Sequence, residues 1–299
     1  MATAMKPPMP RGDSAKEPYH IYYADADVLR ADFEAPVHEK IKPRAQVTLS
    51  ADGHYQFRQA EPFRLEGLIS YRGGYTQVAG HKSPKPGHGF ATLSTSVVEE
   101  LNVLDVLTAD RVVAQIITEH PVYDPANGQT DGVPSVSFLG TRFDNLRIDG
   151  HKVELERHLD ILGHKPDDGK SYFEDESVLG RISQQYANIN EANDLPDWAS
   201  ERYLWDQAAA SRQDKLKCSL VERVTGAPGT QFGHVIDVPH FGKIFLAELT
   251  LKREKNGAPG PEKYSFHLSM IRMELGCPVQ ASGNVGNADA NGTGSKGTP

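Results

Sequence analysis

The tripeptide Asp-Gly-His occurs twice in this chain, each time flanked by residues that alternate between apolar and polar. The first pair is Asp52-Gly53 and the second is Asp149-Gly150. A two-residue Asp-Gly loop readily adopts positive φ at both central positions, as a type I′ turn requires, and the twist of that turn matches the twist of paired strands. Each pair therefore predicts a β-hairpin.

Apolar residues also recur with a period of two away from these turns. The pattern is clear in Phe63–Tyr71, Phe245–Lys252 and Tyr264–Met270, and it is typical of half-buried strands. The segment Asp110–Thr118 is β-branched and apolar on both faces, as expected of a central strand. At Met270-Ile271 the apolar phase flips, which predicts a bulge or a change of sheet. We expect a mainly β fold, an antiparallel β-sandwich or barrel-like domain with a partly helical, acidic insertion.

The ends of the chain differ in composition from the part between them. Residues 1–18 are rich in proline, lysine and small residues and predict a disordered arm. Residues 280–299 are rich in glycine, asparagine, alanine and serine and predict a flexible tail. The β-rich domain is therefore expected to cover residues 19–279. Within it, the Gly- and Pro-containing stretch Arg72–Phe90 predicts a mobile loop.

The insertion is expected at about residues 156–216, where the alternation fades. Between residues 166 and 216 the chain has 11 acidic and 5 basic side chains, so this segment carries most of the negative charge. Two helices are predicted inside it, at about residues 174–186 and 199–215, the second after the break that Pro196 supplies.

The composition of the 299 residues restricts the class of protein. Hydrophobic residues make up 38% and charged residues 24%, as in soluble globular proteins. A net charge of −8 argues against broad binding to a nucleic-acid backbone. The sequence has no apolar run of the ~20 residues that a membrane helix needs and no apolar signal segment. The default expectation is a cytoplasmic protein, with an exported or surface-associated protein as the alternative, and whether Cys218 and Cys277 pair is left open.

Three segments resemble bacterial choice-of-anchor P surface proteins: Asn102–Val112, Ser137–Thr141 and Leu146–Gly150. The segment Phe266–Gly276 is similar to the closing strand of those proteins. The resemblance implies a β-rich, bacterial, surface-displayed domain with a structural role, and it brings no catalytic residues to transfer.

A metal site is one interpretation of several polar residues. Asp25 and Asp27 are spaced by two, which places both carboxylates on one face of a strand, where they could share a cation such as calcium. His81 and His88 lie in the same predicted loop and are candidate zinc ligands. The alternatives are a solvated strand face for the aspartates and ordinary loop positions for the histidines. The stretch Asp124–Gly132 lacks the closing glutamate of a calcium loop, and an ordinary hairpin loop is favoured there.

Three aromatic residues flank the predicted mobile loop: Tyr71, Tyr75 and Phe90. Aromatic side chains beside such a loop are candidates for a ligand or partner surface, with packing at strand ends as the alternative. Cys218 follows two lysines, Lys215 and Lys217, which could activate a thiol, although an unreactive thiol is favoured.

Motifs of nucleophilic catalysis, of P-loops and of dinucleotide binding are missing from the sequence. We therefore expect a non-enzymatic binding or assembly protein without a cofactor, with a protein partner or self-association through open strand edges. Two alternatives remain: a glycan-active hydrolase that uses a pair of carboxylates, and a metal-dependent binding module.

Overall fold

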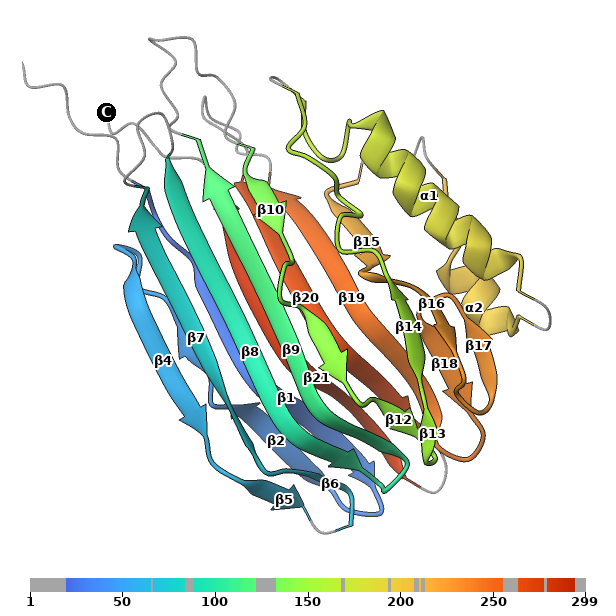
Figure 1. The fold of residues 1–299 in the computed structure, drawn as a ribbon. Helices are drawn as coiled ribbons and strands as arrows, with labels where there is room; N and C mark the ends of the chain where they lie inside the picture. Colours follow the sequence, from blue (N-terminus) through green and yellow to red (C-terminus); the bar gives the residue numbers. More distant parts are fainter. Residues whose placement is uncertain are drawn as a thin grey trace, which may run out of the picture.

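The chain folds into two antiparallel sheets that pack face to face (Figure 1), which confirms the predicted mainly β, sandwich-like fold. The structure is a computed structural model, and it describes residues 20–65, 67–83, 89–121, 133–167, 170–192, 195–206, 210, 213–254, 263–276 and 279–293. The predicted arm at residues 1–18, the stretch Asp124–Gly132, His88 and Cys277 lie outside the described residues.

The first sheet has nine strands within the described chain. Their order across the sheet is β17 (Thr230–Phe232), β18 (Val235–Val238), β19 (Gly242–Glu254), β20 (Lys263–Leu275), β21 (Gln280–Thr293), β1 (Ala24–Ala35) and β2 (Glu39–Arg44), with β15 (Lys215–Ser219) beside β19 and β3 (Val47–Thr48) beside β1. The strands nearest the middle are also the longest, so this sheet provides a broad, rigid face.

The second sheet has ten strands within the described chain and centres on the long strands β8 (Phe90–Val103) and β9 (Leu107–His120). The other strands are β4 (His54–Ala60), β5 (Phe63–Leu65), β6 (Ile69–Tyr71), β7 (Gly73–Lys82), β10 (Ser135–Ser137), β11 (Arg142–Asp144), β12 (Arg147–Ile148) and β13 (His151–Lys152). A separate pair of strands is formed by β14 (Glu154–Arg157) and β16 (Val221–Thr225). The prediction of a mobile loop at Arg72–Phe90 is wrong for most of these residues, because Gly73–Lys82 form strand β7, which pairs with β4 and β8.

The segment predicted to be a flexible tail is a central strand of the first sheet. Gln280–Thr293 form β21, which pairs with β20 on one side and with β1 on the other, so the prediction is wrong for these residues. Val285, Ala288 and Ala290 lie on either side of Gly286 and are fully buried, with 0% exposure. The segment has few large apolar side chains and the period of two breaks at Gly286, so the hydrophobic signal was too weak to predict a strand.

Small residues allow the two sheets to approach closely at one end of the sandwich. Ala24 and Ala26 of β1 are fully buried. Opposite them, the Ser94 and Ser96 hydroxyls of β8 each donate a 2.8 Å hydrogen bond, to the backbone oxygens of Asp25 and Asp27 respectively. Side chains this short leave room for hydrogen bonds between the sheets, where larger side chains would hold the sheets apart.

Of the two hairpins predicted from the Asp-Gly-His segments, only the second one forms. Asp149 and Gly150 have φ values of 48° and 75° and join the paired strands β12 and β13, which confirms the second predicted hairpin. The first prediction is wrong, because Gly53 N donates to Ser50 O, and the strands on either side pair elsewhere: β3 with β1, and β4 with β7. This turn therefore carries the chain from one sheet to the other.

The two helices α1 and α2 of the described residues lie in the segment where the sequence predicted helices. The first, α1 (Glu176–Asn190), begins at Asp175, whose carboxylate caps it by accepting from the backbone of Ser177 and Val178. The second, α2 (Asp197–Arg202), is shorter than predicted, since β15 begins at Lys215. The helices lie beside the β15 and β17 edge of the first sheet (Figure 1).

Candidate functional site

Four neighbouring strands of the first sheet are interrupted at the same level. The ladder pairing skips Ala247 of β19, Met270 of β20, Gly286 of β21 and Val28 of β1. Ala247 and Gly286 have positive φ values, 49° and 64°. The positions that carry inward apolar side chains shift by one residue here, as the sequence predicted at Met270-Ile271. The shift occurs at the same level in all four strands. We call these four residues the interruption row.

The phase flip turns a row of mostly polar side chains on each side of the interruption row toward the outward face. On one side the register aligns Glu248, Ser269, Asn287 and Asp27, which we call the polar row. On the other side it aligns Phe245, Arg272, Asn284 and Arg30. Interruptions of this kind redirect side chains and often accompany binding sites.

Three of the four residues of the polar row are buried although they point outward. Ser269, Asn287 and Asp27 are 3%, 0% and 1% exposed. Burial raises the pKa of Asp27 to about 6, against the opposing effects of Arg30 and of a hydrogen bond from Asn287. Within the described residues, four buried polar atoms here have no hydrogen-bond partner: Ser269 Oγ, Asn287 Oδ1, Asn284 Oδ1 and Arg30 Nε. Because buried polar atoms in native proteins are nearly always hydrogen bonded, this group indicates a place for a ligand or ordered water.

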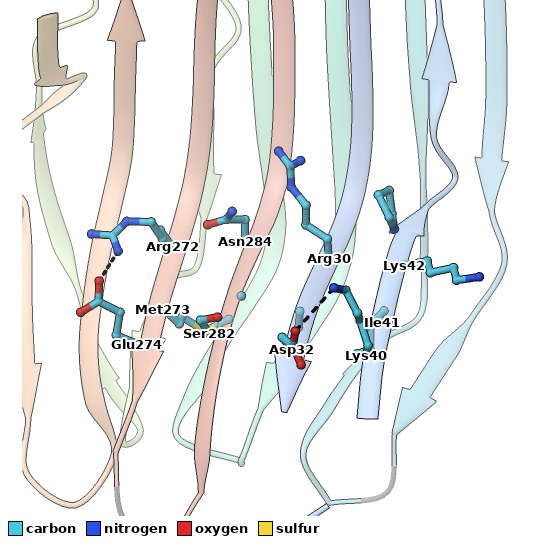
Figure 2. Close-up of a pocket in the computed structure, with 13 residues that line it drawn as sticks. Arg30, Asp32, Lys40, Ile41, Lys42, Arg272, Met273, Glu274, Ser282 and Asn284 are labelled. Atoms are coloured by element: carbon cyan, nitrogen blue, oxygen red, sulfur yellow. Dashed lines mark hydrogen bonds and ion pairs between the residues drawn. The ribbon is translucent and has the colours of Figure 1, made fainter. Parts of the chain in front are cut away.

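A groove runs along β21 next to these atoms (Figure 2). Its floor is low because the outward side chains of β21 at this level, Ser282 and Asn284, are short. Longer charged side chains form its walls, from β20 on one side and from β1 and β2 on the other (Figure 2). The groove encloses about 440 Å³. We call it the β21 groove, and its polar side chains are Arg30, Asp32, Lys40, Lys42, Arg272, Glu274, Ser282 and Asn284.

Ion pairs lie on both walls of the β21 groove. Lys40 Nζ lies 3.7 Å from Asp32 Oδ2, and Arg272 is paired with Glu274 (Figure 2). Glu274 and Asp32 stand opposite Ser282 on either side, two strand spacings apart, which corresponds to about 10 Å between their Cα atoms. Each carboxylate is held by a cation, which is the opposite of the environment a general acid needs. The walls therefore offer hydrogen-bond donors and acceptors rather than a general acid.

A compact charged cluster anchors the β20 wall to α2. Arg202 Nη2 donates a 3.1 Å hydrogen bond to Glu248 Oε1, and Arg272 Nε donates to the other oxygen of Glu248. The guanidinium carbons of Arg202 and Arg272 lie 4.4 and 3.6 Å from the centre of the Phe245 ring. Burial on its own would raise the pKa of Glu248, but His234 and Arg272 lower it overall, so this carboxylate stays charged.

The three candidate metal ligands that the structure describes, Asp25, Asp27 and His81, do not form a metal site. Asp25 and Asp27 share the outward face of β1 as predicted, but Asp25 accepts hydrogen bonds from Gln46 and Thr48, and Asp27 is buried beside Asn287. His81 lies in the second sheet, on β7. In the described parts of the chain, no three histidine, cysteine, aspartate or glutamate side chains gather as metal ligands would.

Two of the three candidate surface aromatics belong to the core. Tyr71 and Phe90 are 3% and 4% exposed, so the prediction of a surface role is wrong for both, and the alternative of packing holds. Tyr75 lies on the outward face of the second sheet, where its ring stacks on Phe57 at 5.7 Å. Sequence reasoning missed Phe57, which is 50% exposed.

Sequence reasoning also missed the β21 groove. Ser282 and Asn284 fell in the predicted tail, and Arg30 and Arg272 had no visible partners along the chain. The available signal was the short alternation of Ala288 and Ala290 with Asn287 and Asp289, which marks one inward and one outward face.

A family model described as a domain of unknown function (DUF8256) matches residues 20–252, which covers most of the chain. No curated protein and no solved structure matches the chain. Neither described helix has the length and apolar character needed to cross a membrane.

Proposed function

This chain belongs to the family described as a domain of unknown function, DUF8256, and we propose that it is a non-enzymatic binding protein that holds a polysaccharide chain in the β21 groove. The observation that carries the proposal is the shape of the outward face. A strand with short polar side chains lies between two strands with long charged ones, which gives a channel along a rigid sheet.

The position of β21 favours an oligosaccharide over a peptide as the ligand. Extended peptides bind sheets by adding a strand at an edge, where backbone groups are unpaired. The backbone of β21 is already paired with β20 and with β1 on its two sides. A ligand in this groove must therefore be recognised by side chains alone, and carboxylate, amide and guanidinium groups match the hydroxyls of a sugar chain.

The proposal can be tested by affinity electrophoresis of the purified full chain through gels that contain soluble neutral or acidic polysaccharides. We expect at least one polysaccharide to retard the protein. The substitution Ser282→Phe should weaken that binding by about tenfold or more, because Ser282 is exposed on the groove floor and the ring would fill the channel. Thermal unfolding at an unchanged temperature would establish that the variant is folded.

The matched control is His151→Phe, which adds the same ring at the exposed hairpin of the second sheet and should leave retardation unchanged. The proposal is overturned if no polysaccharide retards the protein, or if the two variants behave alike. Release of shorter oligosaccharides during incubation would instead support the hydrolase alternative.

A further inference from the structure

A second cavity opens on the same outward face, beside the β21 groove. It encloses about 290 Å³, and the two share Arg272 and Asn284 in their linings. The charged and polar side chains added here come from three strands and one helix: Lys215 and Lys217 of β15, Glu248 and Thr250 of β19, His267 and Ser269 of β20, and Arg202 of α2. We call it the lysine pocket.

The lysine pocket has an excess of positive charge. Glu248 is the carboxylate in its lining, and Arg202 and Arg272 already occupy both of its oxygens. The same two arginines also pair with Glu274, so their charges are balanced. Lys215 and Lys217 have no carboxylate partner among the described residues, in a chain whose net charge is −8. Partial burial, and then the charges of Lys215 and Arg202, lower the pKa of Lys217.

A serine hydroxyl and a histidine ring complete the pocket. Ser269 is 3% exposed, and its hydroxyl has no hydrogen-bond partner within the described chain. The His267 ring is fixed by a 2.7 Å contact between its Nδ1 and Asp289 Oδ1, and this contact does not use Nε2. Ammonium groups beside an unused hydroxyl, above a rigid sheet, are what an oxyanion needs for both charge and hydrogen bonds.

We infer that the lysine pocket binds an anionic group, a carboxylate, sulfate or phosphate ester, carried by the ligand in the adjacent β21 groove. This inference rests on the proposed function, because the shared residues Arg272 and Asn284 place the anion and the sugar chain on one continuous surface. It assigns the ligand to the acidic polysaccharides.

Calorimetric titration of the full chain with matched oligosaccharides tests the inference. The probes are a neutral dextran fragment, a galacturonate oligomer, a heparin oligosaccharide and a phosphorylated maltooligosaccharide. We expect one or more of the anionic probes to bind at least about tenfold more tightly than the dextran fragment. The double substitution Lys215→Gln and Lys217→Gln should remove that preference and leave dextran binding unchanged. The arm that shows the preference identifies the anion.

The control is Lys82→Gln with Lys152→Gln, which removes the same charge from exposed positions of the second sheet. Equal binding of neutral and anionic probes, or an equal loss in the control, overturns the inference and leaves the groove function intact. If no oligosaccharide binds, titration with inorganic sulfate and phosphate, followed by amide NMR, separates the two ideas. Shifts around Lys217 that the pocket variant abolishes would retain the anion site and overturn the groove function, whereas an absence of shifts would overturn both.

Discussion

Asn287 Nδ2 donates a 2.9 Å hydrogen bond to Asp27 Oδ1, which joins the last strand of the sheet to the first across 260 positions of sequence. Both side chains are buried on the outward face of the first sheet, between the β21 groove and the cluster around Asp25. The contact shows that β21 is part of the folded domain, and it places a titratable group beside the candidate site.

Asp27 should make the protein less stable at neutral pH than at acid pH. Burial raises its pKa from 3.8 to about 6, so the folded protein holds the proton more tightly than the unfolded chain. The stability from this group is therefore full below about pH 4 and is lost as the pH rises to about 6. Asp27→Asn should raise the free energy of unfolding at pH 7 by about 1–3 kcal/mol and should give no gain at pH 4. Urea denaturation at both pH values measures this, with Asp25→Asn as the control. A loss of stability at pH 7 would contradict it.

His20 should have the opposite effect on the pH dependence of stability. Burial lowers its pKa from 6.5 to about 4, and its ring stacks on Phe90 at 4.8 Å. The unfolded chain therefore takes up the proton first, and stability is lost as the pH falls from about 6.5 to 4. His20→Phe should reduce the acid-induced loss by up to about 3 kcal/mol, whereas His151→Phe at an exposed position should not. Denaturation curves across this pH range would show whether the two variants differ.

The close approach of the sheets should be sensitive to side-chain size. Ala288 is fully buried on the inward face of β21, where Ala288→Leu would force the sheets apart and cost about 1–3 kcal/mol or more. On the outward face of the same strand, Ser282→Leu should change the free energy of unfolding by less than about 0.5 kcal/mol. Urea midpoints of the two variants provide the comparison, and equal midpoints would exclude close packing at Ala288.

Two glycines should differ in their tolerance of a methyl group. Gly150 has a φ of 75° and nothing within 4 Å of an added Cβ, so Gly150→Ala should cost only backbone strain, about 1 kcal/mol. At Gly74 an added Cβ would lie 2.0 Å from the Val97 backbone oxygen, so Gly74→Ala should cost several times more or prevent folding. Thermal unfolding of both variants tests the order of these effects.

Cys218 should be unreactive in the folded protein. It is free and 4% exposed, and burial raises the pKa of its thiol, so little reactive thiolate forms. In a Cys277→Ser background, Ellman's reagent should label Cys218 only after urea is added. Prompt labelling of the native protein would show that the thiol is accessible.

Local sequence determined the features that depend on neighbouring residues. The Asp149-Gly150 hairpin, the long alternating strands and α1 could all be predicted, because turn geometry, side-chain period and helix capping act over a few residues. The same reasoning failed at Asp52-Gly53, because Asp52 does not adopt the positive φ of a type I′ turn and the two flanking strands pair in different sheets.

The position and the residues of the candidate site depend on the tertiary structure. Ser282, Asn284 and Asn287 lie in a segment of small residues with little hydrophobic signal, and they became strand residues because β20 and β1 supply hydrogen bonds on both sides. The short side chains of Ser282 and Asn284 form a groove only because the longer Arg30 and Arg272 lie on the strands beside them. Arg30 and Arg272 come from opposite ends of the chain, so their proximity cannot be predicted from neighbouring residues. The sequence alone thus determined the kind of fold, and the sheet pairing decided where a ligand can lie.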